Sequence, residues 1–447
     1  MVGDVAKTRR SVLGGSAAVG AAGLLAACGA SAQGPGATHP EIKGTVQIWG
    51  LPLFDFNADV GAEIVREFEA KHPGVKVEYT LVDDQNGDKT RVATAGGTPP
   101  DLVSPNGLIP QSLAADGVAA SFEPFLKTSK IIRKQDLWPT FINDHSWKGE
   151  LVGMAYGPDI RIMYLGGDRY ARAGLDANKP PKTWQEFEAA VIKTTERDGG
   201  AVKTAGFHPF IGSGTELTWT VPFWQLGGEL LNADGTKVTI DNEKGLQAWE
   251  WIVKVVNMQG GWGPLQDLRR NAVASQKFVD GELANYYEAN SSRTNAAFAK
   301  GIQSGFKYGF SHYPLPPGGR RITFGGVHTY VMPKASKQQA VSWAFLEHLL
   351  SPEVNIRFAD RYDRIPVRQS IAKSPQYLRN DPFRILSTEE MAGRRWMIPA
   401  PGAWAMRSDV STVALDILDQ GLSIRAALAK TQATLQQKLD AALQAAK

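Results

Sequence analysis

Apolar residues in the first part of the chain alternate between the spacing of strands and that of helices. Residues 45–49 form a short buried-type run that stops at Gly50, and the apolar residues after Asp59 recur at helical spacing until residues 72–74. Strict alternation at residues 75–81 follows, with a short helix expected at 88–95 and a third strand at 101–103. This order of strand, helix, strand, helix, strand predicts parallel pairing.

Helical patterns continue through the rest of the chain. Thr183 and Glu186 have the spacing of a capping box, which predicts a helix that ends near residues 199–200. Further helices are expected from about Asp241, from Ser336 to Leu350, and from Ser423 onward. Their stripes of Trp and Leu are typical of helix faces that pack on a core.

The N-terminus has the three zones of an export signal. Lys7, Arg9 and Arg10 precede a small apolar run that is too short to span a membrane, and the run ends in Leu-Ala-Ala-Cys at Cys28. That ending resembles the lipobox of bacterial lipoproteins, so residues 1–27 are predicted to be a signal peptide and Cys28 to carry a lipid. The alternative for Cys28 is a buried or reactive thiol.

The arginine pair also resembles a twin-arginine export signal, with an ordinary secretory signal as the alternative. Residues 28–43 are small, rich in Gly and Pro, and predicted to be a flexible tether. The expected location is therefore the cell membrane, with the chain anchored by lipid on its extracytoplasmic face, in the periplasm or at the cell surface.

Length and charge narrow the class of the remaining chain. The chain after the tether has about 400 residues, more than a single hydrophobic core usually holds, and this length predicts two domains. The net charge is +4, of which the signal peptide carries +2, so no nucleic-acid partner is expected. Cys28 is the only cysteine, which excludes disulfides within the chain and thiolate metal sites.

Catalytic and metal-binding patterns are not found in the sequence. The seven histidines are scattered without ligand spacing, and no nucleophile elbow or phosphate loop occurs. Asp83 and Asp84 form a carboxylate pair that a solvated turn explains. We therefore expect no enzyme activity, no metal and no cofactor, with a polysaccharide hydrolase as the rival class.

Four stretches resemble the extracellular solute-binding proteins that serve sugar ABC importers, the group that includes maltose-binding protein. One runs from residues 151–164 through Ala-Gly-Leu at 173–175 to Pro-Pro-Lys-Thr-Trp-Gln-Glu-Phe at 180–187, and this last block is the most specific match. The others are residues 45–74, residues 98–103, and residues 325–336 followed by 365–368. Together they span nearly all of the chain that follows the tether.

The resemblance implies an α/β fold of the two-lobed periplasmic-binding-protein type II class, with hinge crossings and a cleft between the lobes. Placing the matches predicts an N-terminal lobe of residues 44–159 plus 325–365 and a C-terminal lobe of 160–324 plus 366–447. A ligand that contacts both lobes would stabilise the closed state. The implied protein is a monomer that takes a carbohydrate to the transmembrane subunits of an ABC permease.

Candidate ligand residues follow from what a sugar requires. Pyranose rings present apolar faces and hydroxyl groups, so their sites use aromatic plates together with carboxylates, amides and arginines. The candidates lie in loops, at strand ends or at the implied crossings: Trp49, Asp55, Asn106, Asp159, Trp219, Trp224, Glu288, Gly326, Arg364, Trp396 and Trp404. The alternative for each Trp is core or inter-lobe packing.

Arginines near the implied crossings favour a different ligand. Arg161 follows the first crossing, Arg361, Arg364 and Arg368 surround the third, and Arg394 and Arg395 lie near the last loop. Guanidinium groups suit carboxylates and phosphates, so an acidic sugar or a glycerol phosphate is the alternative ligand. Surface ion pairs with Asp360 and Asp363 are the alternative explanation.

Overall fold

The computed structural model describes residues 42–51, 54–212, 218–269, 273–396 and 400–446. Cys28, the signal peptide and nearly all of the predicted tether lie outside the described residues.

A small parallel sheet contains the first three strands. Strand β1 (Gly44–Gly50) lies between β2 (Val75–Leu81) and β3 (Leu102–Val103) and is parallel to both. Helices α1 (Asp59–Lys71) and α2 (Asp88–Ala95) connect the strands. The predicted order of elements and their parallel pairing are confirmed.

Short elements follow this sheet. They are α3 (Pro110–Ala115), α4 (Glu123–Thr128), η1 (Lys134–Asp136), α5 (Pro139–His145), β4 (Ser146–Trp147), β5 (Glu150–Leu151) and β6 (Met154–Ala155). Proline stands in the first turn of α3, α4 and α5, where its missing N–H removes no helical hydrogen bond.

A mixed five-stranded sheet has the order β11-β7-β10-β9-β8. Its strands are β7 (Arg161–Gly166), β8 (Glu196–Asp198), β9 (Ala201–Phe207), β10 (Leu283–Ala289) and β11 (Tyr308–Ser311). Strand β10 is parallel to β9 and antiparallel to β7. The helical elements of this region are α6 (Gly167–Arg172), α7 (Trp184–Thr194), α8 (Thr220–Gln225), α9 (Glu243–Asn257), α10 (Trp262–Arg269), α11 (Ala274–Val279), η3 (Asn290–Thr294) and α12 (Ala296–Gln303).

Helix α7 begins as predicted but ends early. The Thr183 hydroxyl accepts from the Glu186 N–H, and the full capping box is present. The helix stops at Thr194 because residues 196–198 pair with β9 as strand β8. The expected end near residues 199–200 is therefore wrong by about one turn and a half.

The last third of the chain contains two short strand pairs and a series of helices. Strand β12 (Thr323–Phe324) is parallel to β14 (Arg394–Arg395), and β13 (Thr329–Tyr330) is antiparallel to β6. The helices are α13 (Gln339–Leu349), α14 (Pro352–Tyr362), α15 (Gln369–Ala372), α16 (Pro375–Leu378), α17 (Pro382–Met391), α18 (Ala403–Leu418) and α19 (Ile424–Ala445).

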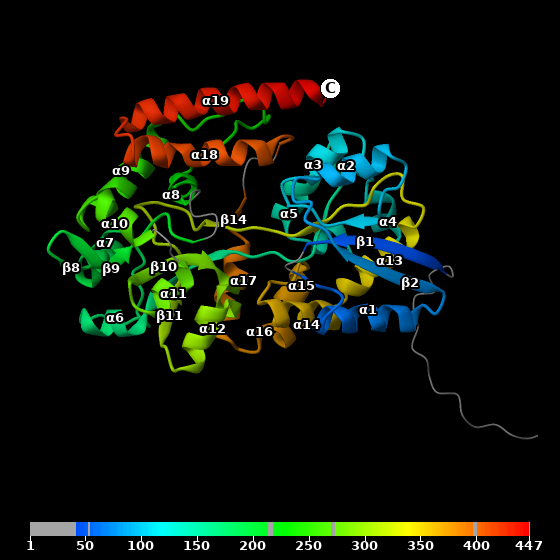
Figure 1. Ribbon diagram of the computed structural model, residues 1–447, viewed down its shortest axis with the longest axis horizontal. Helices are drawn as coiled ribbons and strands as arrows, with labels where there is room; N and C mark the ends of the chain where they lie inside the picture. The colour runs from blue at the N-terminus through cyan, green and yellow to red at the C-terminus, as the bar shows by residue number, and fades with distance from the viewer. Residues whose placement is uncertain (1–41, 52–53, 213–217, 270–272, 397–399, 447) are drawn as a thin grey trace, which may run out of the picture. The chain divides into compact units, whose positions relative to one another are not determined.

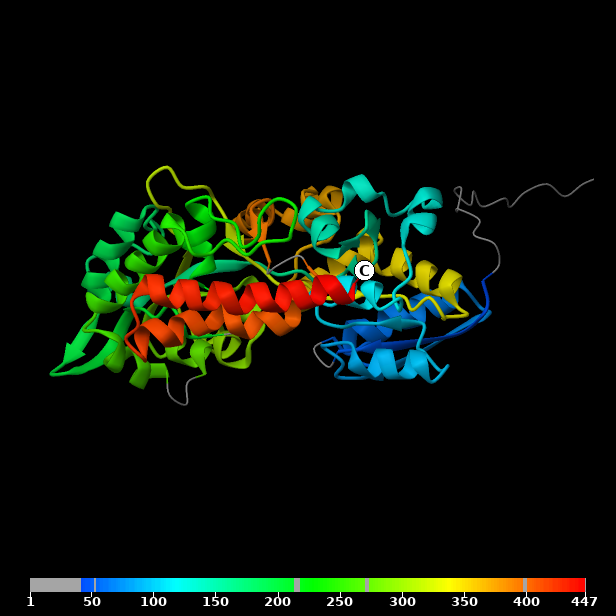
Figure 2. The same cartoon turned by 90° about the horizontal axis from the view of Figure 1, so that it is seen from above.

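Helices α18 and α19 lie side by side and run in opposite directions, as Figure 1 and Figure 2 both show. The Ser423 side chain caps α19 by accepting from the Ala426 N–H. Leu428, Leu435 and Leu439 are fully buried, so the predicted stripe faces the core. This pair positions the residues of α18 that take part in the site described below.

Replacing Leu435 with alanine should leave a cavity between α19 and the core. The expected loss in unfolding free energy is about 2–5 kcal/mol, because Leu435 is 0% exposed. Urea denaturation followed by circular dichroism measures the change. The exposed Gln437→Ala on the same helix is the control, and an equal loss in both variants would contradict the assigned packing.

Candidate functional site

Asp159 joins three segments that are far apart in the sequence. Its Oδ1 accepts hydrogen bonds from the Gly326 N–H at 2.9 Å and from Nη1 of Arg161 at 2.5 Å. Its Oδ2 accepts from Nη1 of Arg364 at 2.5 Å. The structure thus brings together the three chain segments that the sequence predicted as crossings, near residues 159, 325 and 366.

Backbone hydrogen bonds hold the same segments. The Asp159 N–H donates to the Gly326 carbonyl at 3.1 Å, and the Ile365 N–H donates to the Pro158 carbonyl at 3.3 Å. The side-chain bonds of Asp159 and these backbone bonds therefore join the same three segments, and together they restrict the relative movement of those segments.

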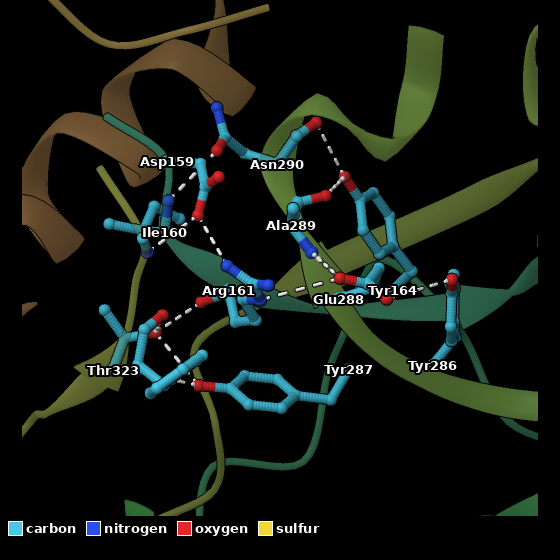
Figure 3. Close-up of polar contacts among 12 residues, drawn as sticks. Asp159, Ile160, Arg161, Tyr164, Tyr286, Tyr287, Glu288, Ala289, Asn290 and Thr323 are labelled. Carbon is cyan, nitrogen blue, oxygen red and sulfur yellow. Dashed lines mark hydrogen bonds and ion pairs between the residues drawn. The ribbon is translucent and has the colours of Figure 1, made fainter. Parts of the chain in front are cut away.

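Glu288 extends this ion-pair group on strand β10. Its Oε1 lies 3.5 Å from Nε of Arg161 and accepts the Ala289 N–H at 2.8 Å. Figure 3 shows Arg161 between Asp159 and Glu288. This placement follows from the sheet, because β10 and β7 are antiparallel with Ala289 opposite Arg161. We call Asp159, Arg161, Glu288 and Arg364 the crossing cluster.

Asn290 and Tyr164 fix the end of β10 next to the crossing cluster. The Ile160 N–H donates to Oδ1 of Asn290 at 3.1 Å, and Nδ2 of Asn290 donates to the Asp363 carbonyl at 2.8 Å. The Tyr164 hydroxyl lies within hydrogen-bond distance of the Ala289 and Asn290 carbonyls (Figure 3). Asn290 was not among the predicted site residues, although Glu288 on the same strand end was.

The charges of the crossing cluster balance one another. Burial would raise the pKa of Asp159, but the positive charges of Arg161 and Arg364 outweigh it and hold that pKa below its usual range. Burial would likewise lower the pKa of Arg161, but the charges of Asp159 and Glu288 raise it. Asp159 and Arg161 therefore stabilise each other's charged form, and Arg364 and Glu288 complete a group of two basic and two acidic side chains.

His328 adds no charge beside the crossing cluster. Burial, together with the charge of Arg364, lowers its pKa to about 3, so the imidazole is neutral at pH 7. Its ring packs edge-on against Phe54 with centroids 4.7 Å apart. The Arg364 guanidinium also lies over Phe54. The arginine that the sequence proposed for an anionic ligand is thus already compensated.

Gly326 and Trp396 meet at the same place. A Cβ on Gly326 would lie 2.7 Å from the Trp396 ring and 3.3 Å from Oδ1 of Asp159, so only glycine allows this approach. Trp396 stacks on Phe324, with centroids 5.3 Å apart and an interplanar angle of 14°. Four predicted ligand residues therefore lie around one point: Asp159, Gly326, Arg364 and Trp396. Glu288 is connected to them by its contact with Arg161.

A cavity of about 570 Å³ lies beside the start of α18, and we call it the aromatic pocket. Its aromatic walls are Phe210, Trp262 and Trp404, and its polar lining includes Arg407, Ser408 and Ser411. Trp262 is held by a hydrogen bond from its Nε1 to Oδ1 of Asp419 at 2.6 Å. The sequence predicted only Trp404 here, because Phe210, after Pro209, and Trp262, between Gly261 and Gly263, lie in stretches with no pattern that marks a site.

Trp404 links the aromatic pocket to the first sheet. It packs against the large core beneath α18 and α19 and also against a small cluster that contains Val103, Val118 and Val331. Trp49 packs on the same small cluster. Two predicted ligand residues from opposite parts of the chain therefore contact a common group of side chains.

Other predicted residues have contacts that packing explains. Trp219 is 0% exposed and donates from Nε1 to the Val410 carbonyl at 2.9 Å, and Trp224 is 2% exposed. Asp55 accepts the Asn57 N–H, and Oδ1 of Asn106 accepts the Leu108 N–H. Core packing accounts for Trp219, whereas Trp224 packs in the same core and also lines a second cavity. Loop hydrogen bonds account for Asp55 and Asn106.

The arginines near the third crossing pair with other carboxylates than expected. Arg361 pairs with Asp59, Arg364 with Asp159 and Arg368 with Asp136. Asp360 instead pairs with Arg379 and Arg384, and Asp363 pairs with Arg293. The expected partners Asp360 and Asp363 were wrong, because the pairs connect segments that no local spacing relates.

Neither a metal centre nor a membrane span is found in the described part of the chain. No group of three or more His, Cys, Asp or Glu side chains there could hold a metal ion. None of the helices within residues 42–446 that the structure describes is both long and apolar enough to cross a bilayer.

Comparison with known proteins agrees with this architecture. The model of the family described as bacterial extracellular solute-binding protein matches residues 63–383, well over half of the chain. The chain belongs to this family. Its members are binding proteins that work outside the cytoplasm, so this chain is an extracytoplasmic binding protein.

Individual relatives are distant but cover most of the chain. A binding protein of Brucella abortus is 24% identical over 413 residues, covering 90% of this chain and 93% of the relative. The sn-glycerol-3-phosphate-binding periplasmic protein of the same organism is 24% identical over 361 residues, covering 74% of this chain and 78% of the relative. The sugar-binding protein MalE from Xanthomonas citri shares the fold, with a TM-score of 0.76, 20% identity, and coverage of 89% of this chain and 98% of that one.

Replacing Asp159 with asparagine should destabilise the crossing cluster, because two buried guanidinium groups lose their shared carboxylate. The expected loss in unfolding free energy near pH 7 is about 3–5 kcal/mol, as for one partner removed from a buried ion pair. The folded pKa of Asp159 lies below the unfolded value, so its contribution is complete above about pH 5 and is lost as pH falls further.

Denaturation of both proteins at several pH values tests this expectation. The difference between them should be constant from neutral pH down to about pH 5 and should shrink in more acidic solution. Asp198→Asn is the control, since Asp198 pairs with Lys203 at the surface and should change stability by less than about 1 kcal/mol. A difference that grows as pH falls would contradict the assigned pairing.

Proposed function

We propose that this chain is the substrate-binding component of an ABC importer and that it captures a neutral carbohydrate, either a mono- or an oligosaccharide. The observation that carries this proposal is the aromatic pocket, in which three aromatic residues stand beside two serines and an arginine. Aromatic faces cover the apolar side of a pyranose, and hydroxyl and guanidinium groups can bond to its hydroxyls. The sugar-binding protein MalE from Xanthomonas citri, which shares the fold, supports the same class of ligand.

An anionic ligand is the main alternative. It is favoured by the relative named for binding sn-glycerol-3-phosphate. The crossing cluster argues against an anion there, because Asp159 already pairs with Arg161 and Arg364 at 2.5 Å and Glu288 lies 3.5 Å from Arg161. An incoming phosphate would have to displace a buried carboxylate, which costs more than placing a neutral sugar on aromatic rings.

Capture is proposed to occur by movement of two lobes about the crossing cluster. The lobes are residues 44–159 plus 325–365 and residues 160–324 plus 366–447, as predicted from the sequence. Trp49 and Trp404 belong to different lobes in this division and pack on a common cluster. A ligand held between the aromatic pocket and the first lobe would stabilise the closed state through its extra contacts there.

Delivery to the permease is proposed to depend on an anchor at Cys28. A lipid on this residue and a tether of residues 28–43 would keep a monomeric receptor close to the transmembrane subunits at high effective concentration. Export by the twin-arginine route would allow the lobes to fold before they cross the membrane. No catalytic step is proposed, since the family members are binding proteins.

Trp404→Ala should weaken ligand binding at least tenfold, equivalent to about 1.4 kcal/mol, because the change removes one aromatic wall of the pocket. Calorimetry with a panel of neutral mono- and oligosaccharides, acidic sugars and glycerol phosphate identifies the ligand and measures the loss. The control is Trp147→Ala, which removes a half-buried ring outside the aromatic pocket.

Three results would contradict the proposal. Tight binding of only the anionic members of the panel would reverse the ligand class. Equal affinity of the Trp404 variant and the unmodified protein would exclude the aromatic pocket. Release of shortened sugars during incubation would indicate a hydrolase.

Cys28→Ser should release the protein from the membrane, because the hydroxyl cannot take the place of the acylated thiol. The measurement is the fraction of protein that sediments with membranes after expression in a bacterium, compared with a Ser31→Ala control that keeps the thiol. Equal membrane fractions for the cysteine variant and the control would exclude the anchor.

A further inference from the structure

A second cavity among the described residues is separate from the aromatic pocket. It has a volume of about 1360 Å³ and shares no lining residue with that pocket. Its walls come from α5, from the segment 227–244, and from the neighbouring segments 320–322 and 392–396. We call it the basic cavity, because its lining includes Lys244, Arg320, Arg321, Arg394 and Arg395. Four carboxylates, Asp144, Glu229, Asp234 and Glu243, also line it, of which Asp144 pairs with Arg394 and Glu243 with Arg425.

The rim arginines of the basic cavity are paired loosely. Arg395 approaches Glu229 no closer than 3.3 Å, and Arg320 lies 3.6 Å from the same carboxylate. The nearest carboxylate oxygen to Arg321 is 3.4 Å away, on Glu389. Charge-assisted hydrogen bonds of this kind are normally about 2.7–2.9 Å long.

This loose pairing is specific to the basic cavity. Arg407 apart, the other described arginines that form ion pairs have a carboxylate oxygen within 3.1 Å, as Arg364 has at 2.5 Å and Arg394 at 2.6 Å. The three arginines with longer pairs therefore all line one cavity. Arg320 and Arg395 also share a single carboxylate, although each guanidinium carries five N–H donors.

Lys244 adds a further cation at the same rim. Its ammonium group donates to the Gly227 carbonyl at 2.6 Å. A Cβ on Gly227 would lie 3.2 Å from Nζ of Lys244 and 3.9 Å from a terminal nitrogen of Arg320, so both cations flank this glycine. The side chains of Arg320 and Arg395 are 54% and 42% exposed, which leaves their remaining donors accessible.

The opposite wall explains why the cavity stays in place. Arg394 has a fully buried side chain and donates to Asp144 at 2.6 Å and to Thr140 at 2.8 Å, both on α5. Its guanidinium also lies over the rings of Phe141 and Trp396. Arg394 is therefore a structural part of the wall, whereas the exposed rim arginines are available to a ligand.

We propose that the basic cavity is a second ligand site, which binds a small polyanion with carboxylate or phosphate groups. Arg320, Arg395 and Lys244 bind the anionic groups, and Glu229 is the carboxylate that the ligand displaces or replaces. A free small molecule fits this site better than a flat surface does, because the cations surround a cavity. The site is independent of the carbohydrate proposed for the aromatic pocket.

Citrate and inorganic phosphate are suitable probes for the full chain. Calorimetry at constant ionic strength should show binding of citrate, and the double variant Arg320→Gln with Arg395→Gln should weaken it at least tenfold. The matched control is Arg361→Gln with Arg379→Gln, which removes the same charge from exposed pairs elsewhere and should change affinity less than twofold. Melting curves establish that each variant is folded.

Glu229→Gln provides a test in the opposite direction. Loss of this carboxylate frees Arg320 and Arg395, so citrate should bind several-fold more tightly than to the unmodified protein. The proposal is overturned if citrate and phosphate do not bind at millimolar concentration, if the control weakens binding as much as the double variant, or if Glu229→Gln leaves the affinity unchanged or lower.

Discussion

The carboxylate of Asp159 is the constraint on which the functional region of this protein depends. One side chain accepts hydrogen bonds from Arg161, Gly326 and Arg364, which stand on three segments of the chain. Removing a carboxylate from water is costly, and only close pairing with cations offsets that cost. The three segments must therefore arrive together for the charge to be stable, and this requirement favours one arrangement of the crossings over others.

The arrangement at Asp159 also sets the positions of more distant residues. Strand β7 begins at Arg161, and its pairing with β10 places Glu288 and Asn290 beside the crossings. Because Gly326 has no side chain, the Trp396 ring can lie close to it and stack on Phe324. From Trp396 the chain leads to α18, whose first turn carries Trp404. The aromatic pocket thus lies only a short stretch of chain beyond the ion pairs that order the crossings.

The sequence predicted the parts of the fold that depend on local patterns. Helices α1, α2 and α19 follow from residue spacing, with a Ser423 cap on α19, and the parallel sheet follows from the alternation of its strands with α1 and α2. The end of α7 was mispredicted because residues 196–198 pair with β9, a partner that helix spacing does not reveal. The Gly- and Pro-broken stretch around Trp219 likewise could not show that its ring faces the core.

Prediction of the site had a similar limit. Asp159 and Arg364 are 205 residues apart, and only the resemblance to a known family placed both near crossings. Nothing in the sequence showed that they neutralise each other, so Arg364 was a candidate for an anionic ligand. The basic cavity was missed for the same reason, since Arg320, Glu229 and Arg395 are neighbours only in the folded chain.

Pairing distance, more than the number of arginines, distinguishes structural cations from those that can recognise a ligand in this protein. A guanidinium at 2.5 Å from a buried carboxylate, as in Arg364, has its charge satisfied and can leave only at a large energetic cost. An exposed guanidinium at 3.3–3.6 Å gains little from its partner, because solvent screens the pair. A ligand that replaces such a weak contact therefore loses almost no interaction energy. Counting arginines along the sequence pointed to the crossings, whereas the strength of their pairs points to a different surface.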